Sequence, residues 1–482
     1  MRLLAIRFLA LSAVLLTSAT AFGQTNYYWN GTGSVATLSS WGRNTNGSGT
    51  NPINFIGSDL LFNIQNAQSA TLDAAWTVNG IGSRLVVQTG GAFNGSTFNP
   101  TLTVNLASGS IYRVDGTYGA LIFGTVDANS TFIFAGSSGF RPLGYGNFIN
   151  QSTNSLNLTG SLTAAGDLRQ SSTNELRGAI NAGGSGINIG RDLIVDTATT
   201  LNLANGTANT TFNIARNLTN SGTISKPGTG SATLNFSGTG TGTATWGTFG
   251  TATTAVTVGV ANGRTVTFAS NYTTSATRGI TNDGTLNLGS GATLAGTGTV
   301  SGSGTITVLT GGTIRGDSGT GTGTLTLTST TVASGGAIAA NVAATGTNSA
   351  LALGSNSLNL ATNSKLALTA VTGFSRAASS YTIASFTSGS NIQLDGVGQA
   401  DNFLFGKYVE GTGASGAVVI DTSALNFALT SGDTFALSRT GNNLVLQFTP
   451  VPEPATVLAV GAAGLAVVGW VRRRRRAATV TA

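Results

Sequence analysis

The sequence predicts an all-β protein whose body is a right-handed parallel β-helix, or β-solenoid. Three observations predict it. Residues 24–450 contain no amphipathic pattern of helix length, short strand-like triplets recur along the chain, and three similar segments begin 25 residues apart. A separate apolar segment near the C-terminus predicts a single transmembrane helix.

The recurring triplets alternate an apolar residue, an asparagine and a second apolar residue. In a strand, the two apolar side chains face one side and the asparagine faces the other, which is typical of a half-buried sheet. Clusters of Gly and Thr, such as residues 316–324, separate these strands and supply turns. The triplets are Leu156–Leu158, Leu201–Leu203, Leu234–Phe236, Leu286–Leu288, Leu358–Leu360 and Leu425–Phe427.

The repeated segments have a measurable period. They cover residues 162–168, 187–193 and 212–218, and each ends in Asp or Asn followed by Leu. A unit of this length with a few short strands is the size of one β-helix coil, and such units must stack to bury an apolar face. This favours a parallel β-helix over a sandwich, which would show hairpin dipeptides at closer spacing.

Aromatic residues gather near the start of the body: Tyr27, Tyr28, Trp29, Trp41 and Trp76. We interpret them as an N-terminal cap that covers the first coil, and the alternative is a platform on which carbohydrate stacks. Together with the apolar–Asn–apolar triplets, this opening resembles the autotransporter-associated β-strand repeat proteins. The translocating C-terminal barrel of that family has no counterpart in the sequence.

The composition excludes several classes of site. Charged residues make up 8% of the chain, against about 25% in ordinary soluble domains. There is no His and no Cys, so the chain cannot build Ser-His or Cys-His pairs, common zinc sites, haem or iron–sulfur ligation, or disulfides. We therefore expect no cofactor and no metal, and an enzyme here would have to use carboxylate, Lys or Tyr chemistry.

Most of the formal net charge of +7 belongs to the two ends of the chain. Seven of the basic residues lie before residue 24 or after residue 450, whereas residues 24–450 carry 16 basic and 15 acidic residues. The body is therefore nearly neutral, and the excess positive charge does not indicate a nucleic-acid partner.

Residues 1–23 have the three regions of a secretory signal peptide. Arg2 and Arg7 give a basic start, Phe8–Leu16 is almost wholly apolar, and small residues follow. We expect cleavage after Ala21 or Gly23 and export of the body. The alternative is a permanent amphipathic anchor, but the apolar stretch is too short to favour spanning a membrane.

The C-terminal tail combines three ordered features. Pro452, Glu453 and Pro454 precede Ala455–Val471, which carries no charge and would span about 26 Å as a helix. Five arginines then follow, and by the positive-inside rule they place the body outside the cytoplasm. These arginines, predicted to stop membrane transfer, are Arg472, Arg473, Arg474, Arg475 and Arg476.

This layout resembles the PEP-CTERM sorting signal of exported bacterial proteins. The resemblance implies that Pro452, Glu453 and Pro454 are recognised by exosortase, a membrane-embedded enzyme that cuts near the motif and releases or transfers the body. It also implies a source that makes exopolysaccharide, which makes polysaccharide a candidate partner. The alternative is an unprocessed single-span anchor, and in both cases the body lies outside.

A stripe of polar residues follows the 25-residue period. Asp167, Asp192 and Asn217 fall at equivalent positions, with Arg191 and Arg216 beside the last two. Paired carboxylates about 5 to 9 Å apart are the signature of glycosidases. The third copy has lost its carboxylate, so we favour solvated turn residues that cap each coil.

Two further short motifs indicate a function only weakly. Gly411–Gly416 satisfies a Gly-x-Gly-x-x-Gly search, but a strand-like segment follows in place of the helix that a phosphate site needs. Arg315-Gly316-Asp317 spells an adhesion tripeptide at a predicted turn. Neither motif carries a functional assignment, and the repeat that builds calcium sites in β-helices is missing.

The sequence thus predicts five segments and a function. The segments are a signal peptide (1–23), an N-terminal cap with the first coils (24–150), Gly/Thr/Asn-rich coils (151–350), C-terminal β coils (351–450) and the sorting tail (451–482). The predicted function is that of an exported, non-enzymatic, structural or adhesive protein of the cell surface or extracellular matrix, anchored in the membrane before processing. A carbohydrate-active β-helix enzyme, a lyase or hydrolase, is the alternative.

Overall fold

The computed structural model describes most of residues 24–451 and a short piece near the C-terminus. The described residues are 24–451, 465–468 and 470–472, with gaps at 66–67, 72, 74–75, 79, 88–91, 95–103, 107, 115–116, 119–122, 136–143, 153–155, 159–160, 172–175, 179–185, 205–206, 208, 253–254, 320, 344–346, 372–373, 375 and 426. The predicted signal peptide, residues 1–23, lies outside them.

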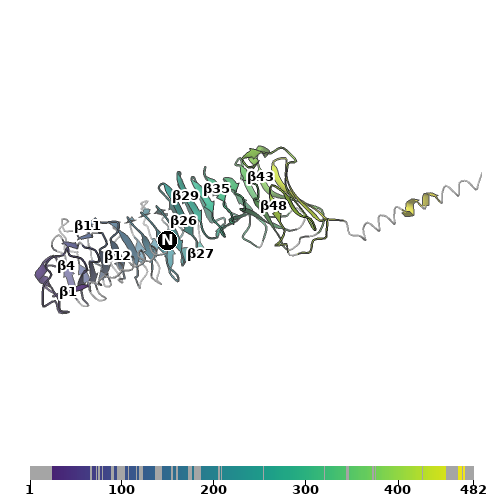
Figure 1. Ribbon diagram of the computed structural model, residues 1–482. Helices are drawn as coiled ribbons and strands as arrows, with labels where there is room; N and C mark the ends of the chain where they lie inside the picture. Colours follow the sequence, from purple (N-terminus) through teal and green to yellow (C-terminus); the bar gives the residue numbers. More distant parts are fainter. Residues whose placement is uncertain are drawn as a thin grey trace, which may run out of the picture. The chain divides into compact units, whose positions relative to one another are not determined.

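The described residues form an all-β solenoid, as predicted, with about ten turns. It divides into two compact units. Unit 1 comprises the described residues up to Ser237 together with 245–256, and unit 2 comprises 238–244 and the described residues from Thr257 onward. In both units short parallel strands follow one another along stacked coils, as the labelled strands in Figure 1 illustrate. The right-handed winding stays a prediction.

Unit 1 contains three long parallel ladders of strands. Each strand pairs in parallel with the equivalent strand of the next coil, so the backbone groups of one coil are satisfied by the coils on either side. The first ladder is β1 (Thr25–Trp29), β3 (Leu60–Ile64), β6 (Arg84–Val87), β9 (Ile111–Val114), β12 (Thr131–Phe134), β14 (Asn147–Asn150), β17 (Leu168–Gln170), β20 (Leu193–Val195) and β23 (Leu218–Asn220). The second is β13 (Gly144–Tyr145), β16 (Leu162–Ala164), β19 (Gly186–Ile189), β22 (Thr210–Ile214) and β25 (Ala232–Phe236). The third is β15 (Leu156–Leu158), β18 (Leu176–Gly178), β21 (Thr200–Asn202), β24 (Thr223–Lys226) and β27 (Thr248–Ala252).

The 25-residue period is confirmed by the strand register. Leu168 pairs with Leu193, and Leu193 pairs with Leu218, so each leucine lies one coil beyond the last. All three side chains are buried. Burial of one leucine is worth roughly 1.5–3 kcal/mol, and this stack is repeated by other apolar rows, so the core of the unit is a set of ladders that run from coil to coil.

The aromatic residues near the start of unit 1 form a buried cluster, and its role as an N-terminal cap stays a prediction. Trp41 and Trp76 stack with ring centroids 5.7 Å apart, and Phe62 packs edge-on against both rings. The short strand β2 (Trp41–Gly42) pairs antiparallel with β1 and covers its edge, which would otherwise invite pairing with another chain. Because Trp41, Trp76, Trp29 and Tyr27 are buried, they do not form the carbohydrate-stacking platform that was the alternative.

Unit 2 continues the same construction with its own parallel ladders. Its strands carry Thr, Val, Leu and Ile, whose branched or apolar side chains suit a pleated, half-buried surface. One ladder is β26 (Gly240–Thr245), β29 (Arg264–Phe268), β32 (Thr285–Leu288), β35 (Thr305–Val308), β38 (Ser329–Val332), β41 (Leu358–Leu360) and β44 (Ile392–Leu394). Another is β30 (Tyr272–Thr274), β33 (Thr293–Gly296), β36 (Thr313–Arg315), β39 (Ala337–Val342), β42 (Lys365–Ala370) and β48 (Val419–Asp421).

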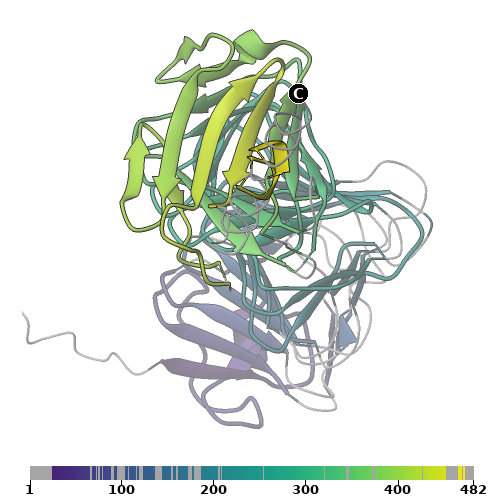
Figure 2. The same ribbon diagram turned by 90° about the vertical axis from the view of Figure 1, so that its right-hand side faces the viewer.

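A seven-stranded sheet that includes antiparallel strands lies at the C-terminal end of unit 2, and the sequence analysis did not predict it. β37 (Thr324–Thr326), β40 (Ala350–Gly354) and β43 (Ser379–Phe386) pair in parallel, but β43 then pairs antiparallel with β50 (Asn443–Thr449). The order continues through β49 (Thr434–Thr440), β46 (Leu404–Val409) and β47 (Gly413–Gly416), all antiparallel. Figure 2 shows these strands in green and yellow.

The apolar–Asn–apolar triplets mostly behave as expected. At Leu234–Phe236, Leu286–Leu288 and Leu358–Leu360 the outer side chains are buried and the asparagine is half-buried. Asn202 is also buried, because β21 ends at this residue and the alternation stops there. Leu425 and Phe427 lie outside any strand, so the last triplet was wrongly predicted.

The C-terminal tail is described only in part. Residues 465–468 and 470–472 are helical, and no helix in the described part of the chain is long and apolar enough to span a membrane. The transmembrane helix predicted over 455–471 is therefore not supported. Pro452, Glu453, Pro454 and Arg473–Arg476 lie outside the described residues, and Arg472 is exposed.

Candidate functional site

The predicted polar stripe is a continuous ladder in unit 1. Its rungs are Asn147, Asp167, Asp192 and Asn217, at the start of β14 or directly before β17, β20 and β23. A side-chain oxygen of each rung accepts a hydrogen bond from the backbone N–H of the next, at 2.9 Å for Asp167, 3.2 Å for Asp192 and 3.1 Å for Asn217. Each rung thereby caps the turn of the coil that follows.

Two arginines tie the ladder together. The Arg216 guanidinium donates from Nε and Nη2 to both oxygens of Asp192, at 2.8 and 2.6 Å. Arg191 donates from Nε to Asp167 at 3.1 Å and from Nη2 to Asn147 at 2.6 Å. Each arginine therefore reaches back to the preceding coil, and the structure brings together all five residues that the sequence singled out.

The electrostatics hold Asp192 as an anion. Partial burial acts to raise the pKa of Asp192, but hydrogen bonds from Arg216 and Asn217 and the charge of Arg216 outweigh it, so the pKa is lowered. Asp192 in turn raises the pKa of Arg216. A glycosidase needs one carboxyl whose pKa is raised so that it can donate a proton, and Asp192 is shifted the other way.

The adhesion tripeptide is folded into a coil of unit 2. Arg315 forms an ion pair with Asp317 at 2.8 Å, and the Asp317 side chain is only 2% exposed. Arg315 also donates to Asn341 at 2.8 Å, and a Cβ on Gly316 would lie 2.0 Å from the carbonyl oxygen of Ala350. The folded coil therefore does not expose the Asp317 carboxylate to solvent, and the tripeptide still carries no functional assignment.

The Gly-x-Gly-x-x-Gly match is a β-hairpin. Gly413–Gly416 is β47, which pairs antiparallel with β46, and the next element is the strand β48. Gly411, Gly413 and Gly416 have φ of 86°, 97° and 100°, which glycine adopts without strain. No helix N-terminus follows the loop, as the sequence predicted.

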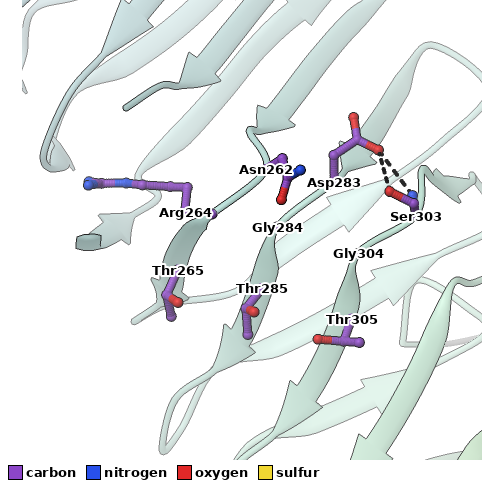
Figure 3. A pocket seen from close by; sticks show the side chains of 10 residues that line it. Asn262, Arg264, Thr265, Asp283, Gly284, Thr285, Ser303, Gly304 and Thr305 are labelled. Carbon is purple, nitrogen blue, oxygen red and sulfur yellow. Dashed lines mark hydrogen bonds between the residues drawn. The ribbon is translucent and has the colours of Figure 1, made fainter. Parts of the chain in front are cut away.

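A shallow polar pocket in unit 2 was missed by the sequence analysis. Asn262, Asp283 and Ser303 lie along one side of it, and the Asp283 carboxylate accepts hydrogen bonds from the backbone N–H and hydroxyl of Ser303, at 3.0 and 3.2 Å. Figure 3 shows Thr265, Thr285 and Thr305 in a row across β29, β32 and β35, with Arg264 pointing away from them. The signal in the sequence was the pair Asp283-Gly284-Thr285 and Ser303-Gly304-Thr305.

No group of three or more potential metal ligands occurs among the residues that the structure describes. In the pocket, Asp283 is the sole carboxylate that lines the wall. The pocket surface therefore offers hydroxyl, amide and backbone groups to a ligand, with little charge.

The junction between body and tail centres on Asp433, which the sequence analysis also missed. Asp433 is fully buried, and Arg376 donates from Nη2 to both of its oxygens at 2.9 Å. The backbone N–H of Thr430 and that of Val451 each donate to the carboxylate, both at 2.9 Å. Val451 is the last described residue before Pro452, so this carboxylate holds the chain directly before the predicted sorting tripeptide.

The segment that follows this junction can be compared with known families. Residues 450–476 match the PEP-CTERM protein-sorting motif. The motif indicates an exported protein that is sorted to the envelope by exosortase. The match supports the resemblance seen in the tail, whereas no family match supports the resemblance of the body to autotransporter-associated repeats. Comparisons with curated proteins and with solved structures find no match.

Proposed function

We propose that this protein is an exported β-solenoid with a structural or adhesive role at the cell surface or in the extracellular matrix. The observation that carries the proposal is the PEP-CTERM motif joined directly to the end of a solenoid body. In this proposal a signal peptide directs export, the tail holds the chain in the membrane, and exosortase then releases or transfers the body.

The surface of the body suits a matrix component. Residues 24–450 are nearly neutral, and outward asparagines hydrogen-bond from coil to coil: Asn213 donates to Asn188 at 2.9 Å and Asn235 donates to Asn213 at 3.0 Å. Rows of threonine, such as those beside the pocket, add hydroxyl groups at the spacing of the strands. We propose exopolysaccharide as the partner, because hydroxyl and amide surfaces exchange hydrogen bonds with sugar hydroxyls without a charge requirement.

The engagement of the paired carboxylates supports a non-enzymatic role. Asp167 and Asp192 are occupied by arginines and by the backbone of the next coil, and the pKa of Asp192 is lowered. We also keep as proposals the right-handed winding of the coil and the kinship of the body with autotransporter-associated repeats.

Two experiments test this function. The purified body is incubated with a panel of acidic and neutral glycans; release of reducing or unsaturated ends that Asp192→Asn abolishes and Asp395→Asn leaves intact would overturn the non-enzymatic role. For sorting, mass spectrometry of the C-terminus compares wild type with Glu453→Ala in cells that carry exosortase. We expect a chain cut near Pro452 in wild type and an intact C-terminus in the variant.

A further inference from the structure

The buried carboxylate of Asp433 is an unusual feature of a body with so few charges. It is fully buried and lies in the turn before β49, where it accepts four hydrogen bonds. Arg376, whose side chain is 31% exposed, supplies the neutralising charge. Burial of an unpaired carboxylate is costly, and three donor groups, Arg376 Nη2 and the backbone N–H groups of Thr430 and Val451, stabilise the ionised form of Asp433.

Two of these contacts join parts of the chain that are far apart in sequence. Arg376 lies 57 residues before Asp433, and Val451 lies 18 residues after it. Thr434, at the start of β49, pairs with Thr449, at the end of β50, so Val451 emerges beside the turn that holds Asp433. The chain is thus fixed two residues beyond the end of the last strand.

The turn itself is shaped to receive Val451. Gly432 has a φ of 96°, a conformation that side chains rarely adopt, and a Cβ at this position would lie 2.7 Å from Cγ2 of Val451. Its backbone N–H donates to the carbonyl oxygen of Glu410 at 2.9 Å, which connects the turn to the residue directly after β46. We call the group Arg376, Asp433 and Val451 the junction clamp.

We propose that Asp433 is a positioning residue for sorting: the junction clamp orders Val451, directly before the Pro-Glu-Pro motif, so that exosortase meets the motif next to a residue that the folded sheet holds in place. This inference rests on the proposed function, because it concerns the same processing step. It adds a requirement that the sorting motif alone does not contain, namely a folded C-terminal sheet.

The physical reason is conformational entropy. A protease-like enzyme binds its substrate in an extended form and must order the residues on both sides of the scissile bond, which costs about 1–2 kcal/mol of backbone entropy for each residue. The clamp fixes Val451 while the sheet folds, so this cost has been met before the enzyme binds. Without the clamp, Pro450 and Val451 must be ordered again at every encounter.

The test follows processing of the full chain by pulse-chase in cells that carry exosortase. The first variant is the double substitution Asp433→Asn with Arg376→Gln, which removes the charge pair without leaving an unpaired guanidinium. The second inserts Gly-Ser-Gly-Ser between Val451 and Pro452, which keeps the clamp and the fold but separates them from the motif. We expect both to be processed about tenfold more slowly than wild type, because the residues before the motif are no longer ordered in advance.

Controls separate this inference from the function on which it rests. Asp395→Asn removes a hydrogen-bonded carboxylate of the same unit that contacts Thr362 and not the tail, and it should be processed like wild type. Glu453→Ala should not be processed at all, and processing of that variant would refute the sorting function itself. If wild type is processed, Glu453→Ala is not, and the insertion variant keeps the wild-type rate, the positioning role is refuted while the sorting function stands.

A measurement without the enzyme checks the clamp directly. The amide hydrogen of Val451 should exchange at least tenfold more slowly in the purified wild-type chain than in the double variant, because a buried carboxylate accepts it. Equal exchange rates would show that the Val451 amide is not hydrogen-bonded to Asp433 in solution, and this result would refute the positioning role.

Discussion

Asp192 shows how a single residue can join three coils of the ladder. Its carboxylate accepts from Arg216, from the backbone N–H of Asn217 and from the side-chain amide of Asn217, while its own N–H donates to Asp167. An unpaired buried N–H costs about as much as a lost hydrogen bond. The residue is therefore better explained as a connection between turns than as half of a catalytic pair.

We expect Asp192→Ala to lower the free energy of unfolding of the body by about 1–2 kcal/mol, because Arg216 and the turn at Asn217 lose their acceptor. The Arg216 side chain is 51% exposed, which limits the contribution of the charge. Urea denaturation followed by circular dichroism measures the change. Asp283→Ala, which removes an acceptor of two neutral donors, should cost less; an equal or larger loss there would contradict the role of the arginine.

The junction clamp should also respond to acid. Burial acts to raise the pKa of Asp433, but hydrogen bonds from Thr430, Val451 and Arg376 and the arginine charge outweigh it, so its folded pKa lies below the ordinary value of 3.8. A group with a depressed folded pKa contributes stability above its unfolded pKa, and that stability is lost as pH falls through the folded value.

We therefore expect the free energy of unfolding of wild type to be constant with respect to Asp433 above about pH 5 and to fall below about pH 4. In the Asp433→Asn, Arg376→Gln variant, the acid part of the curve should be shallower, since the titrating carboxylate is gone. Denaturation curves between pH 7 and pH 2 provide the measurement. If the free energy of unfolding of the two proteins falls with the same slope below about pH 4, Asp433 does not contribute to the pH dependence.

At the scale of the elements, glycines decide how closely successive turns stack. A Cβ on Gly284 would lie 2.3 Å from the carbonyl oxygen of Arg264 and 2.4 Å from that of Ala261, both in the preceding coil. A Cβ on Gly304 would likewise lie 2.2 Å from the carbonyl oxygen of Gly284. These contacts are with backbone atoms, which cannot move aside without displacing the ladder.

We expect Gly284→Ala to destabilise unit 2 by about 1–3 kcal/mol, because the new methyl group forces two coils apart. Gly321→Ala is the matched control: a Cβ there meets nothing within 4 Å and its φ is not in the left-handed region, so its midpoint of unfolding should match that of wild type. Thermal unfolding of the two variants makes the comparison. A similar loss in both variants would contradict the role of coil spacing.

The elements also show what the sequence could predict. The period of unit 1 was readable because Leu168, Leu193 and Leu218 recur at one spacing and stack in one row. The antiparallel strands were not foreseen, although Gly441-Asn442 is a hairpin dipeptide that joins β49 to β50. A single turn signal could not outweigh the stacked pattern that precedes it, and strand direction depends on contacts between distant segments.

The sequence likewise identified some residues of the candidate sites and missed others. Asp192 and Arg216 were identifiable because they belong to the repeat. Asp433 and Arg376 belong to no repeat and lie 57 residues apart. No pattern in the neighbouring sequence indicates that Asp433 contacts Val451. Long-range pairing of this kind follows from the topology of the sheet, which the sequence pattern alone did not provide.

At the scale of the whole molecule, most of the excess positive charge lies at the two ends of the chain. The chain has a pI near 10.0 and a formal net charge of +7, yet residues 24–450 are nearly neutral. If the ends are removed during export and sorting, the mature body loses almost all of this excess. Its solubility then depends on hydroxyl and amide groups and only weakly on charge, so salt should have little effect on it.

This distribution leads to a test with membranes. The full chain should bind vesicles that contain anionic lipid at low salt, because each arginine near such a surface contributes about 1 kcal/mol of attraction, whereas residues 24–450 alone, which lack both ends, should not bind. A full-length variant with Arg472 to Arg476 changed to Gln isolates the arginines from the apolar segment and should bind more weakly than wild type. Vesicle flotation measures all three. Binding of residues 24–450 as strong as that of the full chain would mean that the outer surface of the solenoid carries a membrane-binding site of its own, and that the arginines of the tail do not account for the attraction.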